Sequence, residues 1–151
     1  MHYRLYVPGD FVALYAIEEE CFAAPVRFSR SYLRRIISHP NTATWIAEEA
    51  RGLCGFGLVQ WTQTRTGMLA YIQTIEVLPE FRGRGVGGEL LRRMEESAIA
   101  ERATAIWLHV EEANEAAIRV YRACAYQLEG REVDYYGQGR AGLLYAKPLA
   151  T

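Results

Sequence analysis

Lysine is nearly absent from this sequence of 151 residues, because Lys147 is the only lysine among 17 basic residues and the other sixteen are arginines. Arginine forms planar, bidentate hydrogen bonds to phosphates, so an arginine-rich chain suggests nucleic-acid binding. However, 18 acidic residues bring the net charge to −1, which argues against the broad basic face that nucleic-acid binding needs. We therefore expect no nucleic-acid partner.

Cysteine is also scarce, and its spacing excludes two further kinds of protein. The three cysteines, Cys21, Cys54 and Cys124, are far apart, odd in number and not accompanied by a C-x-x-C or histidine-rich segment. This pattern fits neither a zinc site nor a framework of disulfides. We expect reduced thiols and no bound metal.

Long hydrophobic runs are missing too. No segment approaches the roughly 18 consecutive apolar residues of a membrane-spanning helix. The first residues, Met1 to Arg4, lead into alternating residues and not into the apolar segment of a secretory signal. We expect a cytoplasmic protein without a membrane partner.

What the sequence does contain is typical of one globular domain over residues 1–151, with 50% hydrophobic and 23% charged residues. The periodicity of the apolar residues predicts an α/β protein whose mixed sheet carries helices on both sides. The expected strands lie near residues 3–7, 43–48, 55–64, 68–78, 105–110, 126–133 and 141–146. The expected helices lie near residues 10–22, 30–38, 87–102 and 114–124.

The sharpest local signal is a glycine-rich turn, Arg82-Gly83-Arg84-Gly85-Val86-Gly87-Gly88, between a strand and a helix. Glycines let the main chain curl closely around a ligand, and the unpaired amides and positive dipole at a helix start attract anions. The two arginines can add charge-assisted hydrogen bonds. A phosphate group is the expected ligand of this turn. The alternative is a turn without a ligand, whose arginines are solvated.

Several phosphate ligands have to be weighed at this turn. A P-loop is excluded because its lysine is missing. The dinucleotide fingerprint G-x-G-x-x-G is met by Gly83, Gly85 and Gly88, with Glu111 at a suitable distance to hold a ribose. That match is weak because a proline-containing linker separates the strand from the first glycine. The third reading is R-x-x-G-x-G, which begins at Arg82.

In this third reading the sequence resembles the GNAT superfamily of acyl-CoA-dependent N-acetyltransferases over nearly its whole length. The resemblance rests on the element order, on Val77-Leu78-Pro79-Glu80-Phe81 before the turn, and on Asn114 and Tyr121 after the next strand. It implies a mixed, mostly antiparallel sheet of about seven strands, and acetyl-CoA as cosubstrate. The cofactor-binding residues that it implies are Ile75, Glu76, Val77, Arg82, Gly83, Arg84, Gly85, Val86, Gly87, Gly88, Asn114 and Tyr121.

Within the superfamily the sequence is most similar to Nα-acetyltransferase catalytic subunits of the E-type branch, and also resembles ribosomal-protein alanine acetyltransferases. The E-type branch carries a catalytic tyrosine and histidine at the positions of Tyr71 and His109, whereas most relatives have Glu at the position of His109. The resemblance implies catalytic roles for Tyr71 and His109, and places Tyr121 near the thioester sulfur. A phenol is protonated at neutral pH, so Tyr121 can donate a proton to the departing thiolate.

Two segments resemble the acceptor site of this branch. Their residues, together with Gln73 on the central strand, form the expected substrate-binding set: Phe22, Pro25, Val26, Gln73, Tyr135 and Tyr136. Three departures from the branch, the extra Ala23-Ala24, Gln73 in place of an apolar residue and Ala125 in place of glycine, bear on peptide preference more than on the acetyl-CoA site. Each aromatic residue also has a plain structural reading as part of a core or hairpin.

Three further expectations concern charged residues. Strict alternation along a strand puts Glu76 on the face opposite Tyr71, which makes Glu76 a secondary candidate for the base. The acidic run Glu18-Glu19-Glu20 and the basic cluster of Arg30, Arg34 and Arg35 are expected to be solvated helix faces near the substrate loop.

Together these observations predict an acetyl-CoA-dependent N-acetyltransferase that works by direct attack in a ternary complex, without metal or covalent intermediate. The expected acceptor is the α-amino group of a protein or peptide N-terminus. A small amine or amino acid is the alternative acceptor. A non-catalytic acyl-CoA or dinucleotide-binding module is the alternative from another class. The protein is expected to be a monomer or a homodimer.

Overall fold

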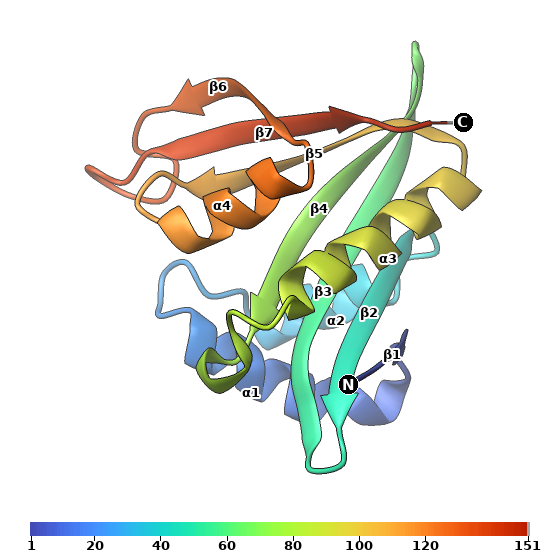
Figure 1. Cartoon of the computed structure of the whole chain (residues 1–151), viewed down its shortest axis with the longest axis vertical. Helices are drawn as coiled ribbons and strands as arrows, with labels where there is room; N and C mark the ends of the chain where they lie inside the picture. The colour runs from blue at the N-terminus through green and yellow to red at the C-terminus, as the bar shows by residue number, and fades with distance from the viewer. Residues whose placement is uncertain (151) are drawn as a thin grey trace.

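The computed structural model describes residues 1–150 and consists of one seven-stranded sheet with helices on both faces (Figure 1). The strands follow the order β1-β2-β3-β4-β5-β7-β6, and every neighbouring pair is antiparallel except β4 and β5. Their bounds are β1 (His2–Leu5), β2 (Thr42–Glu49), β3 (Gly52–Thr64), β4 (Gly67–Val77), β5 (Ala103–Glu111), β6 (Gln127–Glu132) and β7 (Gly142–Pro148). This arrangement confirms the predicted mixed, mostly antiparallel sheet.

The α-helices form two layers. Their bounds are α1 (Phe11–Cys21), α2 (Arg30–Ile37), α3 (Val86–Ala100) and α4 (Glu115–Ala123), and short 3-10 turns cover Pro8–Asp10 and Pro79–Phe81. One core cluster joins α1 and α2 to strands β2 and β3 through residues such as Leu14, Leu33 and Phe56. The other core joins α3 and α4 to the opposite face through residues such as Leu91 and Met94. The sheet is therefore buried on both sides, which explains the apolar runs of its central strands.

The helix ends follow from local chemistry. The Ser29 side chain accepts a hydrogen bond from the Tyr32 amide and so caps α2. Asn114 caps α4 in the same way, with its Oδ1 3.2 Å from the Ala117 amide nitrogen. Helix α3 begins one residue earlier than predicted, at Val86, because Gly85 takes a left-handed conformation just before it.

The two central strands diverge along their length, as Figure 1 shows for β4 and β5. Their parallel pairing joins Met68–Tyr71 to Ala103–Trp107 and ends there. Beyond Tyr71, β4 remains paired with β3 while β5 pairs with β7. In the described part of the chain, the edge of β4 from Ile72 to Val77 therefore has no strand partner on the side of β5.

A β-bulge at Gln73 corrects the expected orientation of Glu76. In the pairing of β3 with β4, Val59 lies opposite Ile72 and Leu58 lies opposite Thr74, so Gln73 is an extra residue. Such a bulge shifts the alternation of side chains by one position. Glu76 consequently lies on the α1 side of the sheet, the side that Tyr71 also faces, and not on the opposite one.

The charged helix faces also differ in part from the expectation. Glu19 and Glu20 are exposed as predicted, but Glu18 is 0% exposed. Arg30 lies 4.4 Å from the centroid of the Tyr15 ring, and Arg34 lies 3.9 Å from that of Phe11. Arg30, Arg34 and Arg35 are exposed as predicted, and the first two also cover aromatic rings of the core.

No helix in residues 1–150 is long and apolar enough to span a membrane.

Candidate active site

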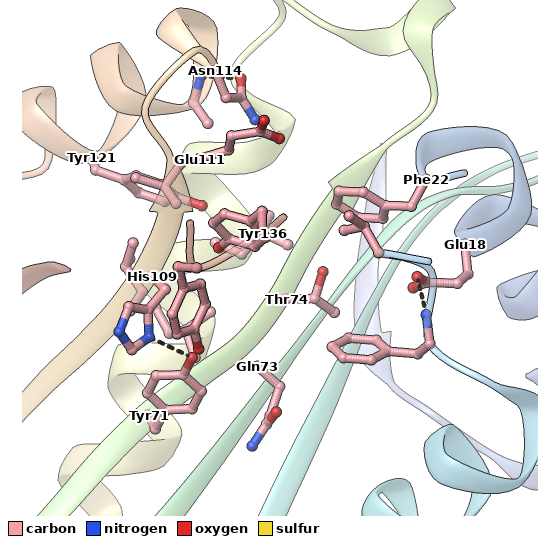
Figure 2. A pocket seen from close by; sticks show the side chains of 18 of the residues that line it. Glu18, Phe22, Tyr71, Gln73, Thr74, His109, Glu111, Asn114, Tyr121 and Tyr136 are labelled. Atoms are coloured by element: carbon pink, nitrogen blue, oxygen red, sulfur yellow. Dashed lines mark hydrogen bonds between the residues drawn. The ribbon is translucent and has the colours of Figure 1, made fainter. Parts of the chain in front are cut away.

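A cavity of about 770 Å³ lies where β4 and β5 separate (Figure 2). Its walls come from four parts of the chain: the two diverging strands, helices α1 and α2 with the segment between them, helix α4 with its cap, and the connection between β6 and β7. The lining residues are Glu18, Phe22, Pro25, Val26, Phe28, Tyr32, Tyr71, Ile72, Gln73, Thr74, Ile75, Trp107, Leu108, His109, Val110, Glu111, Asn114, Ala117, Tyr121, Tyr135 and Tyr136.

Most of the residues chosen from the sequence meet in this one cavity. They include Tyr71, His109 and Tyr121, which were predicted to be catalytic, as well as Ile75 and Asn114 and all six residues of the expected substrate-binding set. The remaining predicted residues lie outside the lining: Glu76, Val77 and the turn of residues 82–88. Separate stretches of sequence thus form one continuous site.

A chain of hydrogen bonds crosses one wall from β4 through β5 to β6. The Tyr71 hydroxyl lies 3.0 Å from His109 Nδ1, as Figure 2 shows, and His109 Nε2 lies 3.1 Å from Glu132 Oε1. Burial is the main cause that raises the pKa of Tyr71 well above its usual value, so its hydroxyl keeps its proton at neutral pH. The tautomer of His109 that carries a proton on Nε2, toward Glu132, accepts the hydrogen bond of the Tyr71 hydroxyl at Nδ1.

Aromatic rings hold His109 in place. Tyr135 stacks on the imidazole with ring centroids 4.2 Å apart and planes at 16°. Tyr136 meets Tyr135 edge-on, and Trp107 packs against Tyr71 with centroids 4.4 Å apart. Because these rings come from β4, β5 and the β6–β7 connection, the imidazole is confined in both position and orientation.

Tyr121 enters the cavity from α4 (Figure 2). Its side chain is largely buried, and burial raises the pKa of its hydroxyl well above the usual value. Among residues 1–150, no group forms a hydrogen bond with the Tyr121 hydroxyl. A protonated phenol facing the cavity is free to donate to a bound group.

The glycine-rich turn forms an open start of helix α3. Gly83 and Gly85 have φ values of 73° and 82°, a conformation that favours glycine. No side chain caps the helix start, and the position where a Cβ would stand at Gly83, Gly85 or Gly88 has no atom within 4 Å. The start of the helix is therefore uncapped and has open space beside these glycines, which suits the phosphates of an acyl-CoA.

The two arginines of the turn are partly engaged. Arg82 donates from Nε to the Val77 carbonyl oxygen at 2.8 Å, and Arg84 lies 5.5 Å from the centroid of the Phe81 ring. Both remain exposed beside the turn, so they can still meet a phosphate.

Acetyl-CoA fits these residues in a second respect. The unpaired edge of β4 offers main-chain groups to an extended amide-containing arm, in the manner of an added strand. Asn114, which was expected to contact this arm, uses its Oδ1 to cap α4. Its side-chain NH₂ group is left as a donor for a ligand.

Charged groups in the lining come as carboxylates. Glu111, weighed above as a ribose ligand, accepts hydrogen bonds from Arg140 at 2.7 and 2.8 Å. The hydrogen bonds from Arg140 lower the pKa of Glu111, and they outweigh burial, which acts in the opposite direction. No lysine or arginine belongs to the lining that the structure describes. The described residues also hold no group of three metal-binding side chains.

Sequence reasoning missed several residues of the site. Glu132 follows no motif, and it meets His109 only because β6 lies two strands away from β5, on the far side of β7. Trp107 precedes His109 by two residues on β5, and this same-face spacing could have identified it. The other missed lining residues include Glu18, Phe28 and Tyr32.

The sheet thus opens beside an uncapped helix start, and a buried Tyr121 and a partly buried His109 line the cavity between the strands, an arrangement suited to an acyl-CoA and an acceptor. The chain matches the acetyltransferase (GNAT) family over residues 11–126. The chain therefore belongs to this family, which confirms the predicted fold and the predicted class of acyltransferase.

Two curated relatives are named for different acceptors. Streptothricin acetyltransferase from Streptomyces lavendulae is 35% identical over 105 residues, which cover 67% of this chain and 52% of that protein. N-alpha-acetyltransferase RimI from Mycobacterium tuberculosis is 37% identical over 65 residues, which cover 43% of this chain and 39% of that protein. The chain thus spans about half the length or less of these relatives.

Solved structures have the same fold over nearly their full length. Nourseothricin acetyltransferase is 27% identical with a TM-score of 0.80, and the match covers 99% of this chain and 98% of that one. Naa20 from Chaetomium thermophilum, in complex with a bisubstrate analogue, is 21% identical with a TM-score of 0.85, covering 99% of this chain and 87% of that one.

Proposed function

We propose that this protein transfers an acetyl group from acetyl-CoA to the α-amino group of a protein or peptide N-terminus, by direct attack in a ternary complex. The observation that carries the proposal is the hydrogen bond of 3.0 Å between Tyr71 and His109 at the closed end of the separated strands. An acceptor amine that binds in the cavity beside Tyr71 can give its proton to this pair.

The donor side is proposed to use mainly main-chain groups. The amides of residues 82–88 hold the pyrophosphate, with Arg82 and Arg84 adding charge. The main chain of Ile75, Glu76 and Val77 pairs with the pantetheine arm, and the Asn114 amide group contacts that arm from α4. Bound in this way, acetyl-CoA supplies the activated acetyl group next to Tyr121.

The proton path follows from the hydrogen bonds. The amine attacks the carbonyl carbon as a C–N bond forms, and it gives its proton to the Tyr71 oxygen while Tyr71 passes its own proton to His109 Nδ1. Glu132 stabilises the imidazolium that results. The C–S bond breaks, and the thiolate takes a proton from Tyr121. Before the next turnover, solvent returns a proton to Tyr121 and takes one from His109.

The acidity of the acceptor suits an α-amine. An α-amine with a pKa of about 7.7–8.0 is already partly neutral at physiological pH, whereas a lysine side chain at about 10.4 is almost wholly protonated. A site that relies on a tyrosine and a histidine, without a lysine or arginine in the described lining, can remove one remaining proton but has no strong base.

The acceptor is proposed to lie between two aromatic segments. Phe22, Pro25 and Val26 receive the first side chain, and Tyr135 and Tyr136 cover the peptide from the β6–β7 connection. Gln73 faces the peptide between these segments, and its amide group is already oriented, since Nε2 lies 2.9 Å from Gln60 Oε1.

A small amine is a second candidate acceptor. The names of streptothricin acetyltransferase and nourseothricin acetyltransferase, both similar to this chain, favour it. The same proton path would serve such an acceptor, and the two candidates differ only in what fills the aromatic half of the cavity.

An acetyl-CoA turnover assay separates the candidates. The panel contains peptides that differ in their first two residues, the same peptides with a blocked N-terminus and an internal lysine, a free amino acid, a polyamine and streptothricin. We expect turnover on free N-termini and none on the blocked peptides. Turnover confined to the small amines would replace the proposed acceptor by the second candidate.

A further inference from the structure

Two buried carboxyl groups that the proton path does not use face each other between α1 and β4. Glu18 is 0% exposed and Glu76 is 2% exposed. Among the residues that the structure describes, neither carboxyl group forms an ion pair with a lysine, arginine or histidine. Two buried carboxylates without a cation cannot both carry a charge at an acceptable cost.

Their hydrogen bonds leave one oxygen of each group without a donor. The Thr74 hydroxyl donates to Glu76 Oε2 at 2.7 Å, and the Phe28 amide donates to Glu18 Oε2 at 3.0 Å. Figure 2 shows the second of these bonds as the dashed line at Glu18. The two Oε1 atoms are buried and have no hydrogen-bond partner in residues 1–150. A proton held by one of these neighbouring carboxyl groups provides a donor that a pair of carboxylates lacks.

The electrostatics support this reading. Burial, followed by the neighbouring carboxyl group of Glu18 and its charge, raises the pKa of Glu76 well above its usual value. The other titratable neighbour is Cys21 on α1, whose pKa burial raises to about 11 and which therefore stays neutral. Arg82 lies 3.6 Å from Cys21 Sγ and donates no hydrogen bond to either carboxyl group.

The pair connects the two functional parts of the cavity. Phe28 ends the segment that carries Phe22, Pro25 and Val26, whereas Thr74 lies on β4 beside the main chain proposed to hold the pantetheine arm. We infer that Glu18 and Glu76 share one proton and are positioning residues, which tie the acceptor segment of residues 22–29 to the donor strand β4. The functional part of this inference rests on the proposed function, because it requires the acceptor to bind against that segment.

The shared proton makes stability depend on pH with a definite sign. The folded protein retains a proton on the pair at pH values where the unfolded chain has lost it, near the ordinary glutamate pKa of about 4.3. The stability contributed by that proton is therefore complete below this value, and it decreases as pH rises toward the pKa of the folded pair.

The first test measures thermal unfolding from pH 5 to pH 9 for the wild type, Glu76→Gln and the exposed control Glu19→Gln. The amide of Glu76→Gln still donates to Glu18 and accepts from Thr74, but it carries no titrating proton. As the pH rises, the Tm of the wild type should fall relative to that of Glu76→Gln, so the difference in Tm should change by about 3–5 °C per pH unit in favour of the variant. This change should stop once the folded pair itself deprotonates. A Tm difference that is constant over this range, as expected for Glu19→Gln, would overturn the shared proton.

The second test concerns position. Glu18→Ala removes the acceptor of the Phe28 amide, and Glu18→Gln restores it. We expect Glu18→Ala to raise the KM for the acceptor about tenfold, the loss of one hydrogen bond to a charged group, with less than a twofold change in the KM for acetyl-CoA. Hydrogen exchange at the Phe28 amide should become faster in Glu18→Ala and recover in Glu18→Gln, with Glu19→Ala as the matched control.

An unchanged acceptor KM together with unchanged exchange at Phe28 would overturn the positioning role. The unfolding and exchange measurements need no turnover. If no peptide is acetylated, the proposed function fails, and these two measurements still decide whether the pair shares a proton and holds the segment.

Discussion

The proposed donor half and the proposed acceptor half of the site are built in different ways. The proposed donor half consists of main chain: the unpaired edge of β4, which lines the cavity as far as Ile75, and the turn before α3, which lies outside the lining. The acceptor half consists of side chains, mostly aromatic, that come from the 22–29 segment, from β4 and β5, and from the β6–β7 connection. A main-chain site tolerates most substitutions other than those of its glycines, whereas a side-chain site changes its ligand with each substitution. This difference explains how one fold can keep its donor while its acceptors vary.

The halves meet at the chain from Tyr71 through His109 to Glu132, and the largest expected effect lies there. Tyr71→Phe removes the hydroxyl that links the acceptor amine to His109. We expect kcat to fall by about 10²–10⁴-fold, the range for general acid–base groups, with little change in the Kd of acetyl-CoA. Steady-state kinetics and calorimetry measure the two quantities. A loss of kcat below threefold would contradict the proposed path.

His109→Gln extends this comparison. Since the two residues act as one path, the double variant Tyr71→Phe/His109→Gln should be no slower than the worse single variant. Multiplicative losses would mean that the two side chains act independently.

Tyr121→Phe tests whether Tyr121, beside the proposed donor half, donates a proton to the leaving thiolate. The thiol that leaves has a pKa of about 8.5, so its departure needs only moderate help from an acid, and we expect kcat to fall about 10²-fold. Acetyl-CoA binding should stay within twofold, as measured by calorimetry. Unchanged turnover would remove Tyr121 from the mechanism.

Gly85→Val tests the main-chain character of the donor half. A β-branched residue is strained at the φ of 82° that Gly85 has, so we expect acetyl-CoA to bind about tenfold to a hundredfold more weakly. The acceptor KM should change little. Gly9→Ala is the control, because the space around Gly9 is open and its φ is ordinary. If Gly85→Val binds acetyl-CoA normally, the turn does not hold the phosphates.

Glu132→Gln is the smallest expected effect. The carboxylate side chain is 53% exposed, so the pair with His109 contributes as an exposed ion pair does, and kcat should fall about twofold to fivefold. Glu129→Gln on the same strand is the matched control and should leave kcat unchanged. An equal kcat for Glu132→Gln and Glu129→Gln would mean that Glu132 has no part in the proton path, which would then consist of Tyr71 and His109 alone.

The local conformation of the glycine-rich turn is the part of the proposed donor half that the sequence predicted. Its determinants are local: a left-handed conformation that glycine provides at Gly83 and Gly85, a helix start, and apolar periodicity that orders the elements. Family resemblance added the acceptor residues, and they meet in the cavity.

The failures lie in features that only tertiary structure decides. The bulge at Gln73 depends on how β3 and β4 pair, and it reversed the expected side of Glu76. Glu18 reads as part of a solvated run of glutamates, yet helix α1 turns it into the core. Glu132 meets His109 across 23 positions of sequence, and no spacing rule anticipates that contact.

The most direct measurement of the central claim is the position of the acetyl group on a peptide that offers both a free α-amine and an unmodified lysine. Tandem mass spectrometry after incubation with acetyl-CoA and the protein locates it. We expect the acetyl group on the α-amine, and its formation should be at least about 10²-fold slower with Tyr71→Phe. Acetylation of the lysine alone, or none of the peptide while a small amine is acetylated, would contradict the account.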